Sequence, residues 1–206
     1  MEAQKSGLEV PVEKPLVTYG EVYPADTIPV LAASAITRKI TAHPMTWGLK
    51  IKADSKRPIL NARVETAAIK PTFKELWESH RCIIPCSWYF EWTHPETGKG
   101  TKYVIQPLGD DKTFLCGLYR ITGRSGEVVV LTRAASESAA QIHDRMPLMI
   151  SERDINAWID PTAGKRALEE LVKRAKTEVA YSPAGPEEDR KKLRTNAKGE
   201  FIFGWE

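Results

Sequence analysis

The stretch that decides the fold is Arg81–Thr132, RCIIPCSWYFEWTHPETGKGTKYVIQPLGDDKTFLCGLYRITGRSGEVVVLT. It contains runs rich in β-branched and aromatic residues, namely Arg81–Pro85, Trp88–Thr93, Lys102–Pro107, Phe114–Tyr119 and Glu127–Thr132. The gaps between them, such as HPETGKG, LGDDK and ITGRSG, carry residues typical of turns. This spacing predicts successive hairpins, and therefore a barrel or closed antiparallel sheet.

Helical patterns and short strands flank this β-rich segment. Pro71–His80 starts with a proline and has apolar residues at helical spacing, which predicts a helix. Further helices are predicted over 134–143, over 151–159 with Ser151 as its cap, and over Gly164–Thr177. Short strands are predicted at Leu16–Tyr19, Ile28–Leu31 and Met45–Ile51. We therefore expect an α+β fold, a single domain with an antiparallel barrel-like β-sheet flanked by helices.

Composition is that of a globular chain. The 206 residues are 42% hydrophobic and 28% charged, which suits one domain of ordinary size. We expect this domain to cover residues 1–183 and a charged C-terminal tail to cover 184–206. No apolar run approaches the roughly 20 residues that span a bilayer, and no secretory signal is visible. We therefore expect a cytoplasmic monomer without a membrane partner. The net charge of +3 permits a polyanionic partner without requiring one.

The cysteines do not indicate a disulfide framework or a metal site. Only Cys82, Cys86 and Cys116 are present, and no second Cys or His pair follows at zinc-binding spacing. Buried reduced thiols in strands are the expected state. We predict no metal and no organic cofactor.

Three segments carry candidate functional residues: Asn61–Thr66 (NARVET), Trp88–Trp92 (WYFEW) and Ile142–Pro147 (IHDRMP). Strand alternation would place Glu91 with Tyr89 on one face and the other aromatic residues on the opposite face. A carboxylate among aromatic rings suits general acid–base work, but a solvent-facing glutamate on a half-buried strand is the alternative.

The other two segments are also ambiguous when taken alone. His143 follows a helical stretch and is a natural proton shuttle, or else a histidine held by Asp144 or the backbone. Asn61 can orient a carbonyl and Arg63 can bind phosphate, or else they form a turn with a surface cation.

Together the segments resemble the SOS-response-associated peptidase (SRAP) family. NARVET, RCIIPCSWYFEW and IHDRMP match its pattern in order, as do GEVYPADTIPVL, MTWGL and TRAASE, from about Tyr19 to Pro161. The resemblance implies an SRAP-like sensor of abasic sites in single-stranded DNA, related to the SOS response to DNA damage. In this family a cysteine at position 2, freed by removal of Met1, closes a thiazolidine with the ring-opened sugar. The product is a DNA–protein crosslink.

The resemblance also implies residue roles. Asn61 would hold the N-terminal amine or the sugar. Glu91 would move protons during Schiff-base formation and methionine release, and His143 would protonate the sugar oxygen and serve in crosslink reversal. DNA-binding residues would be Arg63 and Arg145, on phosphates, with Trp47 and Trp88 stacking or giving apolar support.

The chain departs from the family at its start. Family members begin Met-Cys-Gly-Arg, whereas this sequence begins Met1-Glu2-Ala3. We therefore expect Met1 to be an internal methionine of a longer protein, and this chain to bind DNA weakly without a covalent adduct. Two other functions stay open: a peptidase (hydrolase) acting on other proteins, and a non-catalytic single-stranded DNA-binding protein.

Overall fold

The computed structural model describes residues 16–18, 20–34, 39–51, 57–95, 97–110, 112–123 and 125–185. The strands are β1 (Thr27–Ala33), β2 (Ile40–Trp47), β3 (Asn61–Arg63), β4 (Arg81–Cys86), β5 (Tyr89–Trp92), β6 (Lys102–Pro107), β7 (Thr113–Thr122), β8 (Ser125–Ala134), β9 (Arg145–Pro147) and β10 (Val179–Pro183). The helices are α1 (Val64–Ala67), α2 (Pro71–Ser79), α3 (Glu137–Ala140), α4 (Ile155–Ile159) and α5 (Lys165–Lys173), with a 3₁₀ turn at Glu152–Asp154.

The main sheet closes on itself. Its strand order is β2-β1-β4-β7-β8-β3, β9 pairs with β8, and β2 also pairs with β8. Strands β1, β2, β4, β7 and β8 therefore form a closed ring, which confirms the expected α+β fold with a barrel-like sheet. The neighbours along the ring are antiparallel, but β2 and β3 both run parallel to β8. The closing contact is thus a parallel pair, which the hairpin pattern does not predict.

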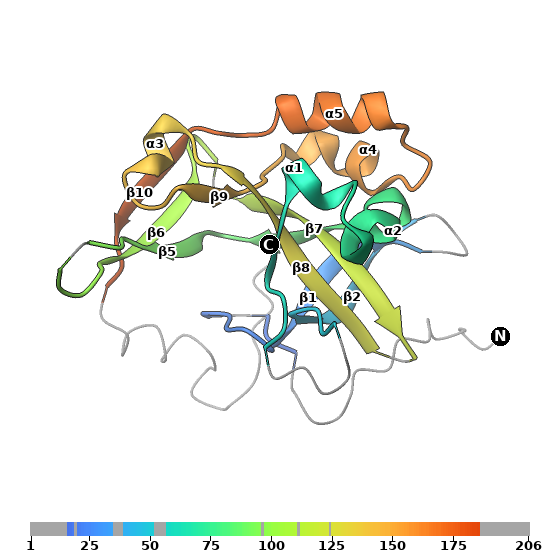
Figure 1. Cartoon of the computed structure of the whole chain (residues 1–206), viewed down its shortest axis with the longest axis horizontal. Helices are drawn as coiled ribbons and strands as arrows, with labels where there is room; N and C mark the ends of the chain where they lie inside the picture. The colour runs from blue at the N-terminus through green and yellow to red at the C-terminus, as the bar shows by residue number, and fades with distance from the viewer. Residues whose placement is uncertain are drawn as a thin grey trace.

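Strand β4 is buried on both faces, which explains its continuous apolar sequence. Ile83 packs in a core cluster shared with α2, α4 and α5, whereas Cys82 and Ile84 pack in a second cluster with β1, β2 and β8. A strand covered on both sides needs no polar alternation. Helices α2, α4 and α5 therefore cover one face of the ring (Figure 1).

A second sheet, of order β10-β6-β5, extends to one side of the ring (Figure 1). All its pairs are antiparallel, with Glu91 opposite Tyr103 and Ile105 opposite both Tyr89 and Tyr181. Ile105 joins this sheet to the second core cluster. Strand β5 thereby reaches the edge of the ring on which β8 and β9 lie.

Several boundaries differ from the sequence prediction. The helix expected over 134–143 is only α3, because β8 continues to Ala134. The strand expected at Met45–Ile51 starts at Ile40 and ends at Trp47, since Gly48 has a φ of +127°. Ser151 precedes the 3₁₀ turn but makes no side-chain cap bond, and the Asp154 carboxylate accepts from Arg174 at 2.7 Å instead.

The ends of the chain fall partly outside the described residues. Of the strand expected at Leu16–Tyr19, Leu16 forms an isolated parallel bridge with Thr27, and Tyr19 is not described. The predicted tail, 184–206, lies outside them from residue 186 onward, so the domain boundary at 183 stays a prediction. In the part of the chain that is described, no helix has the length and apolar character needed to cross a membrane.

Candidate functional site

The site forms where β5, the segment before β9, and β3 with α1 approach one another. Each of the three sequence segments singled out above lies on one of these elements. Side chains connect them at two places: donor atoms of Glu91 and His143 lie within 4.8 Å of each other, and Glu65 forms an ion pair with Arg145. Segments 50 to 80 residues apart in sequence are thus held together by the sheet.

Glu91 lies on β5 as strand alternation predicts. Lys102 Nζ sits 4.0 Å from the Phe90 ring centre and 4.8 Å from that of Trp92, so these two rings share a face. Tyr89 lies on the other face, where burial and then the Glu91 charge raise the pKa of its hydroxyl. Glu91 is half-buried, and its Oε1 accepts the Trp92 backbone N–H at 3.2 Å.

His143 is held by its Nδ1 atom just before β9. The Arg145 backbone N–H donates to Nδ1 at 2.9 Å, and Asp144 Oδ1 lies 2.9 Å from the same nitrogen. An unprotonated Nδ1 accepts from Arg145, while a protonated Nδ1 donates to Asp144. In either state the ring is oriented through Nδ1, which leaves Nε2 for the cluster with Glu91.

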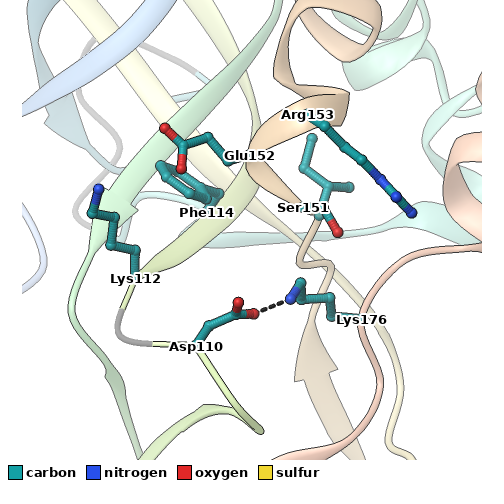
Figure 2. A pocket seen from close by; sticks show the side chains of 8 residues that line it. Asp110, Lys112, Phe114, Ser151, Glu152, Arg153 and Lys176 are labelled. Atoms are coloured by element: carbon teal, nitrogen blue, oxygen red, sulfur yellow. Dashed lines mark hydrogen bonds and ion pairs between the residues drawn. The ribbon is translucent and has the colours of Figure 1, made fainter.

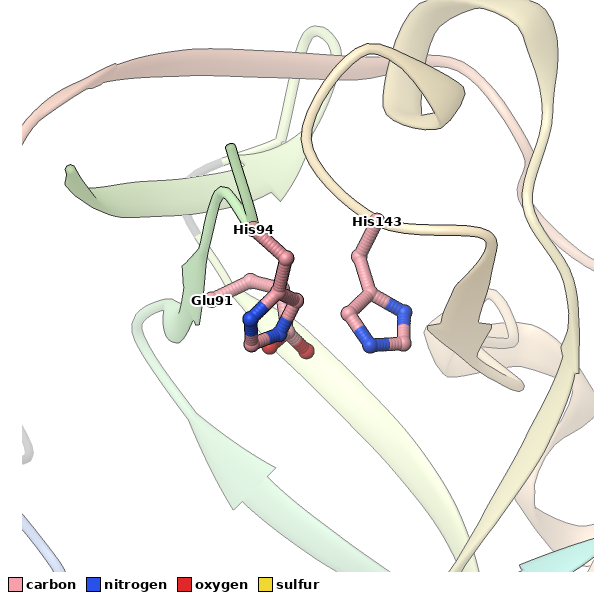
Figure 3. Close-up of side chains that lie close together, drawn as sticks. All are labelled: Glu91, His94 and His143. Carbon is pink, nitrogen blue, oxygen red and sulfur yellow. The ribbon is translucent and has the colours of Figure 1, made fainter. Parts of the chain in front are cut away.

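His94 completes this cluster, and sequence reasoning missed it. Donor atoms of Glu91, His94 and His143 all lie within 4.8 Å of one another, and the two imidazole rings meet edge to face at 5.4 Å between centres. Figure 3 shows the carboxylate and both rings turned toward one another. The signal in the sequence is the spacing Glu91-x-x-His94, in which His94 is also the first residue of the predicted turn HPETGKG.

Glu65 ties the NARVET segment to the IHDRMP segment. Arg145 donates through Nη1 and Nη2 to the two carboxylate oxygens of Glu65, each at 2.8 Å, and also to Thr132 O. Hydrogen bonding from Arg145 lowers the pKa of Glu65 from 4.5 to about 2. Arg145 is therefore already paired with a carboxylate, so a phosphate would have to share or displace Glu65.

Asn61 and Arg63 lie on the exposed face of β3, whereas Ala62 between them is buried. They pair in register with Val130 and Thr132 of β8, and Thr132 in turn faces Pro147 of β9. Strand β8 therefore lies between β3, which carries Asn61 and Arg63, and β9, which follows His143. Their roles toward Glu91 and His143 stay predictions.

The two candidate tryptophans differ in their surroundings. Trp47 is part-buried against the second core cluster, and its indole N–H donates to Leu60 O at 3.1 Å. This contact gives Trp47 a packing role just before β3. Trp88 is 46% exposed beside β5, which leaves its ring free to stack with a base.

The thiols cannot serve as nucleophiles in this fold. Cys82 and Cys116 are buried, and burial raises the pKa of both thiols well above the ordinary value. Burial also raises the pKa of Cys86 to about 12. The thiolate is the reactive form of cysteine, and it is scarce at these positions near neutral pH.

A separate hollow of about 450 Å³ lies away from the three segments. It is lined by Asp110, Lys112, Phe114, Ile150, Ser151, Glu152, Arg153 and Lys176, and Asp110 forms an ion pair with Lys176 across it (Figure 2). Acidic and basic groups alternate around it, so it offers no field of one sign for a charged ligand. The candidate residues are elsewhere, at the junction of the two sheets.

Comparisons with known proteins identify the family of the chain. The model of the family described as SOS response associated peptidase (SRAP) matches residues 4–186. The abasic site processing protein YedK of Escherichia coli is 31% identical over 145 residues, which cover 68% of this chain and 65% of YedK. The abasic site processing protein YobE of Bacillus subtilis is 31% identical over 126 residues, covering 57% of this chain and 58% of YobE. The matched stretch thus spans less than two thirds of either relative.

Solved structures share the fold. A phage-related protein from Bordetella bronchiseptica superposes with a TM-score of 0.67 at 18% identity, covering 80% of this chain and 81% of that protein. Since the family model covers most of the chain and the fold agrees, the chain belongs to the SOS response associated peptidase family.

Proposed function

We propose that this domain recognises abasic sites in single-stranded DNA and transfers protons at the exposed sugar aldehyde. The observation that carries the proposal is that donor atoms of Glu91, on β5, and His143, just before β9, lie within 4.8 Å of each other. Relatives at 31% identity are named abasic site processing proteins, which supports the same substrate class for this chain.

The chemistry of an abasic site suits such a pair. The ring-opened sugar presents a C1′ aldehyde, to which an amine adds to give a carbinolamine. Loss of water then forms an imine, and this step needs a proton on the leaving hydroxyl and a base for the proton on nitrogen. With Nδ1 of His143 accepting from Arg145, Nε2 carries the proton and acts as the donor. Glu91 then acts as the proton acceptor.

The group that attacks the sugar is distinct from the two side chains that transfer protons. The sequence contains three cysteines, Cys82, Cys86 and Cys116. Cys82 and Cys116 are buried, and desolvation raises the pKa of Cys86 to about 12, so none of the three is suited to attack on the sugar. The proposal for this chain therefore concerns recognition of the site and proton transfer, with any thiazolidine crosslink dependent on an N-terminal cysteine.

DNA binding would use cations and an aromatic ring around this pair. Arg63 is exposed on β3 and suits a phosphate contact, while exposed Trp88 suits stacking with a base. Arg145 would contribute by keeping Glu65 neutralised as well as by any phosphate contact of its own.

The test is a binding comparison on three labelled oligonucleotides: single-stranded with one abasic site, single-stranded and intact, and duplex with one abasic site. We expect the abasic single strand to bind at least about tenfold more tightly than either other DNA, a difference of roughly 1.4 kcal/mol. Arg63→Ala should lower the slope of log affinity against log salt by about 1, because one phosphate contact is lost.

Arg153→Ala is the matched control, since Arg153 lines the separate hollow. It should leave the salt slope of binding unchanged. Equal affinity for intact and abasic single strands would reject abasic-site recognition, and an unchanged slope in Arg63→Ala would reject the phosphate contact by Arg63.

A further inference from the structure

We propose that Glu91, His94 and His143 form a binding site for one divalent cation of the zinc class. Two imidazoles and one carboxylate are a ligand set that zinc uses when three protein groups bind it and a fourth position stays open. These three side chains come from β5, the segment after it and the segment before β9, and they converge on one point (Figure 3). The sequence expectation of no metal rested on the lack of a second Cys or His pair at zinc-binding spacing after Cys82 and Cys86, and it did not include His94.

The geometry is close to that of a zinc site. The donor atoms lie within 4.8 Å of one another. Metal bonds of about 2.1 Å in a tetrahedron place neighbouring donors about 3.4 Å apart. A small inward rotation of the side chains closes this difference. His94 is exposed on the segment that follows β5, so its ring can make this rotation without disturbing the core.

Asp144 supplies the support that a metal-bound histidine requires. A metal on Nε2 of His143 requires the ring proton to be on Nδ1, and such histidines usually donate that proton to a carboxylate or carbonyl. Asp144 Oδ1 already lies 2.9 Å from Nδ1. The Arg145 backbone N–H stabilises the other tautomer, in which Nδ1 carries no proton and accepts a hydrogen bond. His143 therefore has a hydrogen-bond partner in each tautomer. Metal binding would select the tautomer that donates to Asp144.

The thiols do not compete for the ion. Zinc binds thiolates strongly, but Cys82 and Cys116 are buried and Cys86 is partly buried, and desolvation raises the pKa of all three thiols. Among the described residues, the cluster of Glu91, His94 and His143 is therefore the site that we expect added zinc to bind. Occupancy would also remove Glu91 and His143 from proton transfer; this consequence, unlike the site itself, rests on the proposed function.

The experiment is a calorimetric titration of untagged, chelator-treated protein with zinc ion alone near neutral pH. We expect one zinc per chain. His94→Ala should weaken the affinity at least about tenfold because one ligand is lost. Asp144→Asn should weaken it by about ten- to hundredfold, the range typical of a residue that orients a metal ligand.

His43→Ala is the control, since His43 lies on β2 and bonds to Thr41 rather than to this cluster. It should bind zinc like the unaltered protein. A denaturation curve of each variant checks folding, and bound zinc should raise the melting temperature of the unaltered protein but not of His94→Ala. Absence of zinc binding, or equal binding by His94→Ala and His43→Ala, would overturn the site.

The two proposals fail separately. Zinc binding that depends on His94 upholds the metal site, whatever the outcome with abasic DNA. Recognition of abasic DNA by a protein that binds no zinc overturns the metal site and leaves the proposed function in place.

Discussion

Glu65 is a surface carboxylate whose ionisation is controlled by one partner. Hydrogen bonds from Arg145 lower the pKa of Glu65 to about 2 in the folded chain, against an ordinary value of 4.5. A lowered folded-state pKa stabilises the fold above pH 4.5, and the contribution is lost as the pH falls from there toward 2. Since Glu65 is roughly half exposed, solvent screening limits this contribution to on the order of 1 kcal/mol or less.

We therefore predict that Glu65→Gln destabilises the protein near neutral pH, and that the difference from the unaltered protein narrows below pH 4.5. Urea unfolding of both proteins at a series of pH values measures this difference in the free energy of unfolding. Glu169→Gln is a suitable control, since Glu169 lies 3.9 Å from Lys165 on the exposed face of α5. A constant difference across the acid range would show that the pair with Arg145 does not set the pKa.

The cysteines give a second prediction at this scale. Because Cys82 and Cys116 are buried and the pKa of Cys86 is raised to about 12, a thiol reagent should react very slowly with the native protein. All three thiols should react at once in denaturant. Fast reaction of one thiol in the native state would mean that the fold near β4 opens readily.

The residues of the site were only partly predictable from sequence. Strand alternation predicted the face of Glu91, because it depends on local geometry alone. His94 was missed because its role depends on a turn direction that brings it back toward His143. The pairing of Arg145 with Glu65 was also missed, since it joins positions 80 residues apart.

At the scale of elements, β7 lies between β4 and β8 and contains one position, Gly117, where only glycine fits. A Cβ on Gly117 would lie 2.9 Å from Val129 O and 3.0 Å from Cys82 Sγ. These atoms belong to β8 and β4, on either side of β7. Neither neighbour can move without disturbing a strand pair, so an added methyl group must strain the ring.

We predict that Gly117→Ala lowers the free energy of unfolding by about 1–3 kcal/mol, the usual cost of overpacking. Denaturant unfolding measures it, and Gly185→Ala, with nothing within 4 Å of its added Cβ, is the matched control. Equal stability of the two variants would mean that the strands around β7 adjust at little cost.

Arg81 is the first residue of β4, and its side chain links this strand to two helices. The side chain is only 2% exposed, and its guanidinium donates to the carbonyls of Trp158, Trp77, Glu78 and Asp160, on or beside α2 and α4. It thereby satisfies carbonyls at the ends of two helices, which helical bonds leave free. Without the guanidinium, those carbonyl oxygens lose their hydrogen-bond donor while they remain buried.

Arg81→Met should therefore lower the free energy of unfolding by about 2–4 kcal/mol, because the buried acceptors lose their charged donor. Arg166→Met, at an exposed position on α5, should change it by less than about 0.5 kcal/mol. Thermal and urea unfolding of both variants measure the contrast. A stable Arg81→Met protein would show that the helices dock by apolar contacts alone.

Helices and strands that carry a periodic sequence pattern could be predicted, whereas the short strands that pair with β8 could not. The helix at Pro71–His80 and the strands at Lys102–Pro107 and Glu127–Thr132 carry clear local patterns and are present with small shifts. β3 and β9 have three residues each, too few for a pattern, and exist because β8 supplies their hydrogen bonds. Tertiary pairing decides such short strands.

For the whole molecule, the sequence predicts a closed sheet, but the pair of strands that closes it could not be predicted from local patterns. The hairpins predict the antiparallel pairs between neighbours in sequence, but β2 meets β8 across about 80 residues and in parallel. The same strand β8 also pairs with β3 and β9. One long strand thus positions the NARVET and IHDRMP segments, and the second sheet brings Glu91 to them.

The central claim is that Glu91 and His143 act as one unit on abasic DNA. A double-mutant cycle tests it: affinities for the abasic single strand are measured for the unaltered protein, Glu91→Gln, His143→Ala and the double variant. Residues in contact within one network couple by about 0.5–3 kcal/mol, whereas independent sites add within about 0.3–0.5 kcal/mol. We predict a coupling of at least about 1 kcal/mol. Additive losses, or no loss in either single variant, would contradict the account.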